Sequence, residues 1–137
     1  MEIRDYTPND EAGCLAICRS LDIKPDVGAF ASYLAQPPDF YYVAEHDGVI
    51  VACGGFGLDR SGAELQWGMV GKQWQRQGLG RFLLFHRLRE IGKKSNVEMV
   101  RLRAPVSESA FFAKQGFRET ASQGAEVDMV KRLAVCS

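Results

Sequence analysis

The spacing of apolar and polar residues predicts a chain of alternating strands and helices. Short apolar runs rich in β-branched and aromatic residues are typical of strands, and apolar residues three and four positions apart are typical of one helix face. Strands are predicted over residues 2–6, 40–45, 49–56, 63–70 and 97–104, with one or two more between 117 and 130. Helices are predicted over residues 10–21, 27–35, 81–91 and 108–115.

Turn residues separate these segments and indicate how they connect. Asn9 or Asp10 is expected to cap the first helix, because short polar side chains accept hydrogen bonds from a helix N-terminus. His46-Asp47-Gly48 joins two strands into a β-hairpin, and Asp59-Arg60-Ser61-Gly62 makes a second turn. A meander followed by strand, helix, strand, helix and strand predicts an α/β fold with a mixed sheet, partly antiparallel and partly parallel.

The composition fits one globular domain over residues 1–137. Hydrophobic residues make up 46% of the chain and charged residues 25%, which is ordinary for a soluble domain of this length. Lys+Arg and Asp+Glu each number 17, so no global positive field favours nucleic acid or an anionic membrane. The N-terminus has no apolar signal region, and no run approaches the roughly 18 apolar residues of a membrane helix. We therefore expect a cytoplasmic protein with neither nucleic-acid nor membrane partners.

The cysteines do not have the spacing of a metal site. Cys14 and Cys18 fall on one predicted helix face with Ile17 and Leu21, as small core residues would. No paired His/Cys set at zinc-ligand spacing accompanies them or the two further cysteines, Cys53 and Cys136. We expect four reduced thiols and no metal.

The segment Gln75-Arg76-Gln77-Gly78-Leu79-Gly80 lies between a predicted strand and a predicted helix, which makes it a candidate phosphate-binding loop. The first N–H groups of a helix have no partner within the helix and point at an anion placed before it. Gly78 and Gly80 would let the backbone approach that anion closely, although a flexible turn alone would also use two glycines. The P-loop pattern and the dinucleotide fingerprint are both absent from the sequence.

These residues resemble the signature of the GNAT superfamily of acyl-CoA-dependent N-acyltransferases, Gln/Arg-x-x-Gly-x-Gly/Ala between a strand and a helix. Gln75, Gly78 and Gly80 fill it. A second family segment, roughly Ala-x-x-Phe-Tyr-x-Lys-x-Gly-Phe, is similar to residues 109–117, with Phe112 where the family has tyrosine. The resemblance extends over nearly the whole chain.

The resemblance implies a GNAT fold in which helices cover both faces of a mixed central sheet. That sheet is splayed between the strands that flank the cofactor, where the pantetheine arm pairs with strand backbone. It also implies acetyl-CoA as acyl donor, with the loop amides binding the pyrophosphate and two arginines adding charge. The implied cofactor-binding residues are Met69, Val70, Gln75, Arg76, Gln77, Gly78, Leu79, Gly80 and Arg81.

Glu64 is the candidate general base. Attack on a thioester needs a neutral amine, and a carboxylate can remove the ammonium proton directly or through water. Glu64 opens the strand that leads into the loop, at an offset that resembles the catalytic glutamate of histone-type relatives. A solvent-exposed strand-edge glutamate is the alternative interpretation, and Glu45 and Asp59 are weaker candidates for the base.

Phe112 leaves the proton donor to the leaving thiolate open. The family commonly uses a tyrosine at this position, and a phenyl ring has no proton to donate. The hypothesis is an N-acetyltransferase that transfers an acetyl group to a primary amine by direct attack in a ternary complex. The alternative is a weak or inactive acyl-CoA-binding module on the same fold. The sequence leaves open whether the acceptor is a small molecule or a protein or peptide amine, and whether the chain forms a homodimer.

Overall fold

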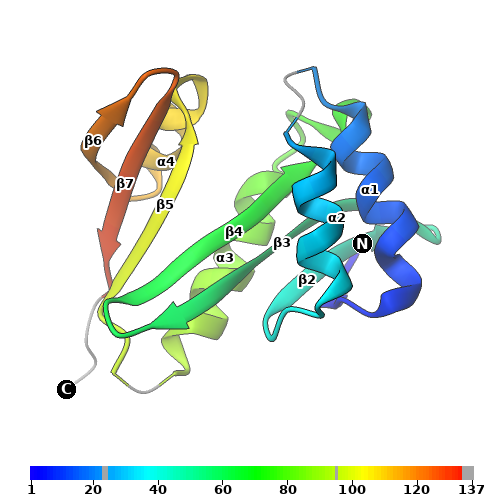
Figure 1. Cartoon of the computed structure of the whole chain (residues 1–137), viewed down its shortest axis with the longest axis horizontal. Helices are drawn as coiled ribbons and strands as arrows, with labels where there is room; N and C mark the ends of the chain where they lie inside the picture. Colours follow the sequence, from blue (N-terminus) through cyan, green and yellow to red (C-terminus); the bar gives the residue numbers. More distant parts are fainter. Residues whose placement is uncertain (23–24, 95, 134–137) are drawn as a thin grey trace. The chain divides into compact units, whose positions relative to one another are not determined.

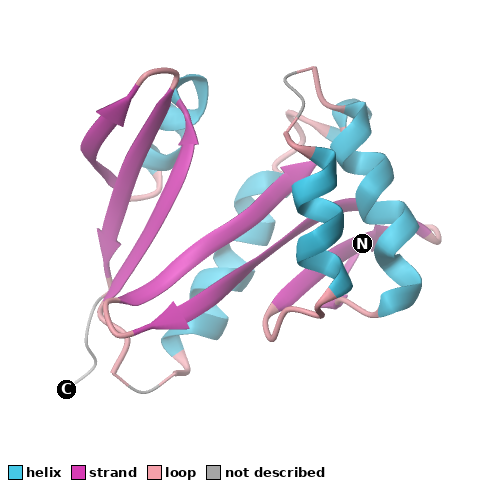
Figure 2. Ribbon diagram, in the orientation of Figure 1, coloured by secondary structure: helices cyan, strands magenta, loops and turns pink. Residues whose placement is uncertain are grey.

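The computed structural model describes residues 1–22, 25–94 and 96–133, which contain seven strands and four α-helices (Figures 1 and 2). Cys136 lies outside the described residues. The chain divides into two compact units, which are described separately. The first contains residues 1–57 and 66–89, and the second contains residues 58–65 and 90–137.

The first unit begins with β1 (Glu2–Asp5), α1 (Glu11–Ser20), α2 (Val27–Ala35) and β2 (Tyr41–His46). It also takes most of β3 (Val49–Asp59), β4 (Gly62–Val70) and α3 (Leu79–Gly92). β1 pairs antiparallel with β2, and β2 pairs antiparallel with β3 across the predicted hairpin. The helix predicted over 27–35 has those bounds, whereas β3 continues three residues beyond its predicted end.

The two faces of the first unit's strands carry different helices (Figure 2). Cys14 and Cys18 of α1 and Phe30 of α2 are completely buried against one face, together with Val43 and Cys53. The prediction of small core cysteines on α1 is therefore confirmed. Successive strand residues point to opposite faces. The glycine that follows Cys53 in β3 contacts α3 instead, so helices cover both faces.

The first helix begins differently from the prediction. Asp10 stands at the N-cap position of α1, but its side chain makes no capping hydrogen bond to that helix. Asp10 instead ends a 3-10 turn over Pro8–Asp10 and accepts a hydrogen bond from the Thr7 N–H at 2.9 Å. The carboxylate also binds Arg4, so tertiary pairing takes the place of a cap.

The second unit is built on β5 (Met99–Pro105), β6 (Arg118–Gln123) and β7 (Glu126–Arg132), with α4 (Ser109–Lys114) after β5. β7 pairs antiparallel with both β5 and β6. The start of β4 pairs parallel with β5, with Glu64 opposite Arg101. The unit's core is formed by residues that are at most 5% exposed: Val100, Leu102, Ala104, Phe117, Val127 and Met129.

The strand order β1-β2-β3-β4-β5-β7-β6 confirms the predicted mixed α/β sheet. Residues 117–130 form two strands, the larger of the predicted numbers. How far the sheet opens between β4 and β5 concerns the placement of the two units and stays a prediction. None of the helices in residues 1–22, 25–94 and 96–133 has the length and apolar character needed to cross a membrane.

Candidate functional site

The predicted phosphate-binding loop lies in the first unit between β4 and α3. Gly71 ends the strand and donates its N–H to the Val51 carbonyl at 2.9 Å, and a 3-10 turn over Lys72–Trp74 follows. The Gln75 side chain donates back to the Val70 carbonyl at 3.1 Å. Gln75 therefore closes the loop onto the strand that precedes it.

Two left-handed residues turn this loop into the helix. Arg76 has φ 64° and Gly78 has φ 83°, a region that favours glycine and strains other residues. No atom of the described residues lies within 4 Å of an ideal Cβ at Gly78. Glycine is therefore suited to position 78 by its backbone conformation, and the space beside it is open.

The backbone amides that lead into α3 are candidates for binding an anion. The first helical hydrogen bond runs from the Phe82 N–H to the Gly78 carbonyl at 3.0 Å. Within the described residues, the hydrogen bonds found include none donated by the backbone N–H groups of residues 76–81. Such N–H groups and the positive end of the helix dipole favour a phosphate or another anion.

The two loop arginines are exposed, as the hypothesis of a phosphate contact requires. The Arg81 guanidinium lies 5.7 Å from the centre of the Phe85 ring, a cation–π distance. Phe85 and Phe82 are themselves about half exposed on α3, at 52% and 55%. The surface around the start of α3 therefore combines positive charge with aromatic rings.

The end of β4 that precedes the loop is irregular. Trp67 has φ 48° in the middle of the strand, where a bulky residue is strained. Its carbonyl accepts a hydrogen bond from the Tyr41 hydroxyl at 2.8 Å, and its ring lies 5.0 Å from that of Phe30. The Met69 side chain is buried in the core, so only its backbone can serve a ligand, as the resemblance implied.

Arg87 of α3 is buried on the other face of the first unit's strands. It is 5% exposed, and its Nε has no hydrogen-bond partner among the described residues. Its Nη1 donates to the Gly55 carbonyl at 3.3 Å, and burial lowers its pKa to about 10. Ideal Cβ atoms at Gly54 and Gly68 would lie 3.2 Å and 2.9 Å from the guanidinium. The two glycines make the space that this side chain fills.

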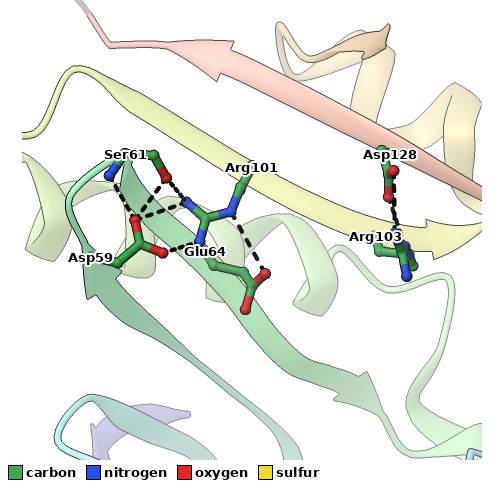
Figure 3. Close-up of polar contacts among 6 residues, drawn as sticks. All are labelled: Asp59, Ser61, Glu64, Arg101, Arg103 and Asp128. Carbon is green, nitrogen blue, oxygen red and sulfur yellow. Dashed lines mark hydrogen bonds and ion pairs between the residues drawn. The ribbon is translucent and has the colours of Figure 1, made fainter. Parts of the chain in front are cut away.

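Glu64 lies in the second unit, in a cluster at the start of β4 (Figure 3). Its Oε2 is 3.7 Å from Nε of Arg101, the residue opposite it on β5. Arg101 also donates to Ser61 Oγ at 2.8 Å and binds Asp59 through two nitrogen atoms. These hydrogen bonds hold the pKa of the Asp59 carboxyl far below its usual range. Asp59, a weaker candidate for the base, is therefore engaged as an anion.

A second ion pair on β5 lies two residues further along. Arg103 Nε donates to Asp128 of β7 at 2.7 Å, and this pairing lowers the pKa of the Asp128 carboxyl.

Phe112, which stands where the family commonly has a proton-donating tyrosine, packs against other aromatic rings. Phe112 is half-buried, and its ring lies 5.1 Å from that of Phe111 and 5.7 Å from that of Phe117.

A cavity of about 790 Å³ lies in the first unit beside α1. Small and apolar side chains of that helix form one wall, and Ile50 and Trp74 lie opposite. Arg4 stands at one end of the cavity, with all five guanidinium N–H groups in hydrogen bonds. The third candidate for the base, Glu45, accepts two of these bonds and is thereby occupied.

The sequence prediction missed the partners that surround these residues. Arg101 is 42 residues from Asp59, and no local pattern signals their contact. Arg87 was not among the residues predicted for the core or for the site. The signal that could have indicated its burial was the pair Gly54 and Gly68, one on each of two neighbouring strands.

The fold and the loop define a class, namely mixed α/β proteins whose strand-to-helix loop has the geometry of an anion site. The model of one family, the acetyltransferase (GNAT) domain, matches residues 37–119. The chain therefore belongs to the GNAT acetyltransferase family.

Solved structures of N-acetyltransferases have the same fold. The ribosomal-protein-S18-alanine N-acetyltransferase from Escherichia coli has a TM-score of 0.81 and 22% identity, covering 99% of this chain and 96% of its own. PaiA N-acetyltransferase from Thermoplasma acidophilum, in complex with coenzyme A, has a TM-score of 0.79 and 16% identity, covering 96% and 98%. N-acetylglutamate synthase from Neisseria gonorrhoeae, complexed with coenzyme A and N-acetyl-glutamate, has a TM-score of 0.81 and 20% identity, covering 98% of this chain but 35% of its own. No match was found among curated proteins.

Proposed function

We propose that this protein is an N-acetyltransferase that transfers the acetyl group of acetyl-CoA to a primary amine by direct attack in a ternary complex. The observation that carries the proposal is the loop into α3, since the hydrogen bonds found among the described residues include none donated by the N–H groups of residues 76–81, in a member of the GNAT family. We take the two units to act together as one acetyltransferase domain.

In this proposal the loop binds the pyrophosphate of the donor. The N–H groups of residues 76–81 donate to its oxygen atoms, and the helix dipole adds favourable potential. The exposed guanidinium groups of Arg76 and Arg81 add positive charge. The backbone of Met69 and Val70 pairs with the pantetheine arm, because the Met69 side chain is occupied in the core.

Glu64 serves as the general base, directly or through a water molecule. Its side chain is 46% exposed, so water and an ammonium group can reach it. No tyrosine hydroxyl is available at position 112, so water is the proposed proton donor to the leaving thiolate.

The acceptor is a primary amine, which the similar structures illustrate in two forms. One is named for the alanine of a ribosomal protein, and another was solved with N-acetyl-glutamate. A panel for this chain therefore contains peptides with N-terminal alanine, free glutamate and a simple diamine. Release of free thiol from acetyl-CoA reports transfer to any of them.

Donor binding is tested separately from turnover. Acetyl-CoA and CoA should raise the melting temperature, because a ligand that binds only the folded state stabilises it. Arg76→Gln and Arg81→Gln should each weaken CoA binding several-fold by calorimetry, since each removes one charge near the phosphates. Arg118→Gln, an exposed arginine of β6, is the matched control and should leave the affinity unchanged. A melting temperature that stays constant at saturating CoA would contradict the proposal.

The second candidate function is an acyl-CoA-binding module without turnover, and Phe112 is the observation that favours it. CoA binding without thiol release for any amine of the panel would support this candidate. Thiol release that depends on the amine would exclude it. Glu64→Gln should then slow turnover most at pH values below the pKa of the amine, where a proton must be removed.

A further inference from the structure

Two carboxylates in the second unit share one guanidinium unequally (Figure 3). Arg101 makes its short hydrogen bonds to Asp59 and Ser61, including one of 2.8 Å to Ser61 Oγ. Its Nε faces Glu64 at 3.7 Å, which is an ion-pair distance but too long for a hydrogen bond.

The turn between β3 and β4 fixes this unequal sharing. The Ser61 N–H and hydroxyl both donate to Asp59 Oδ1, at 2.8 Å and 2.7 Å, so the carboxylate is held by its own turn. Ser61 Oγ then accepts from Arg101. The turn therefore presents a pre-arranged acceptor pair to the guanidinium, whereas Glu64 approaches it from the strand.

Arg101 could bind Glu64 more closely if the turn released it. The two residues are opposite each other in the parallel pairing of β4 with β5, and neighbouring side chains on one sheet face are within reach. A guanidinium in full contact stabilises the charged form of a carboxylate and makes it a weaker base. Among the charged groups near Glu64 are Arg101 and Arg103 from β5. Asp59 shares Arg101 with Glu64, and Asp128 engages Arg103.

We propose that Asp59 and Ser61 are positioning residues that hold the Arg101 guanidinium at ion-pair distance from Glu64 and prevent it from closing into a hydrogen-bonded pair with this carboxylate. The inference deepens the proposed function and rests on it only for the role of Glu64 as the base. The distribution of charge around Glu64 is a property of the second unit by itself.

The test is a carbon-detected NMR titration of the Glu64 carboxyl group in a double-mutant cycle of Asp59→Asn and Arg101→Gln. Arg101→Gln should raise the titration midpoint by about half a pH unit, because it removes a nearby cation. Asp59→Asn should lower it by a similar amount, because it removes a nearby anion and releases the guanidinium. Glu119→Gln is the control, since it removes an exposed carboxylate of β6 and should leave the midpoint unchanged.

The cycle separates positioning from simple charge. Loss of the Asp59 charge lowers the midpoint in both backgrounds, whereas release of the guanidinium acts only where Arg101 is present. A larger effect of Asp59→Asn with Arg101 than without it supports the inference. Equal effects in the two backgrounds overturn it.

Activity then tests the proposed function separately. If Glu64 is the base, the acid limb of the pH–rate profile should move with the NMR midpoint in each variant, and Glu64→Gln should remove that limb. Midpoints that move while the rate profile stays fixed would support the positioning by Asp59 and refute Glu64 as the base.

Discussion

Each unit of the molecule contains one arginine between an aspartate and a glutamate, and the two clusters differ in how the arginine is shared. In the first unit Arg4 donates to both carboxylates, with bonds of 2.8 Å to Asp10 and of 2.8 and 3.0 Å to Glu45. In the second unit Arg101 binds the aspartate closely and faces Glu64 at 3.7 Å.

The carboxylates of the first cluster are also more deeply buried than those of the second. The Asp10 side chain is 7% exposed, whereas those of Asp59 and Glu64 are 49% and 46% exposed. A buried carboxylate must have its hydrogen bonds satisfied, and an exposed one can exchange them with water. The comparison indicates that the first cluster stabilises the fold, while the second leaves its glutamate accessible for chemistry.

The largest expected effect comes from Asp10→Asn. The substitution leaves the Arg4 guanidinium without its buried counter-ion, and we expect a loss of about 2 kcal/mol in the free energy of unfolding at pH 7. Urea denaturation followed by circular dichroism measures this loss. The matched variant Asp59→Asn changes an exposed carboxylate, whose ion pair is screened by water, and should lower the urea midpoint clearly less than Asp10→Asn. Equal losses for the two variants would remove the distinction between the clusters.

The pH dependence of Asp10 follows from its hydrogen bonds. Arg4 lowers the pKa of the Asp10 carboxyl, so the folded state holds this group as an anion at a pH where the unfolded chain takes up a proton. The stabilisation is present above the unfolded value near about 4, and it is lost as the pH falls through the lower folded value. The gap in stability between wild type and Asp10→Asn should therefore narrow below about pH 4. If the difference in stability between wild type and Asp10→Asn stayed constant below about pH 4, it would come from packing and not from the charge of Asp10.

Arg87 extends the comparison to a buried arginine whose Nη1 donates to the Gly55 carbonyl. Gly68→Ala should cost about 1–2 kcal/mol, because the new methyl group would lie 2.9 Å from Nη2 of Arg87. Arg87→Met should recover most of that loss in a double-mutant cycle, since a methionine side chain can bend away. Gly92→Ala is the control, because, apart from its neighbours in the chain and the backbone of its own helix, no atom of the described residues lies within 4 Å of its ideal Cβ. If Gly68→Ala cost as much stability in the Arg87→Met background as in wild type, the loss would come from distortion of the strand and not from contact with the guanidinium.

The sequence predicted the elements better than the contacts between them. The helix over 27–35 was predicted with its bounds because its signals are local, namely one apolar face and Pro37-Pro38 after it. The structure adds a cap at its start, where the Asp26 side chain accepts from the Ala29 N–H. The left-handed backbone at Trp67 and the contact of Arg101 with Asp59 depend on residues far apart in the chain, so no local pattern reveals them.

The helix after the loop shows the same limit of local pattern. Leu84 and Ile91 of this helix are fully buried, and Leu88 at the same spacing is only half-buried. Arg87 is buried although it is charged, so the apolar spacing alone does not define the buried face. The reason lies in β3 and β4, where two glycines leave room for a long side chain. The candidate site residues of the loop could be named from one motif, whereas the charges that act on Glu64 required the structure.

The smallest expected effect, and the cleanest probe of the second cluster, is Ser61→Ala. It removes the hydroxyl that donates to Asp59 and accepts from Arg101 while changing no charge. The Asp59 carboxylate keeps its hydrogen bond from the Ser61 N–H, so the guanidinium should shift only partly toward Glu64. We expect the Glu64 titration midpoint to fall by about 0.2 pH units by NMR, with Ser122→Ala of β6 as the exposed-serine control. Because the variant is neutral, a fall in the midpoint can come only from where the guanidinium lies, and an unmoved midpoint would leave Asp59 alone as the residue that holds it.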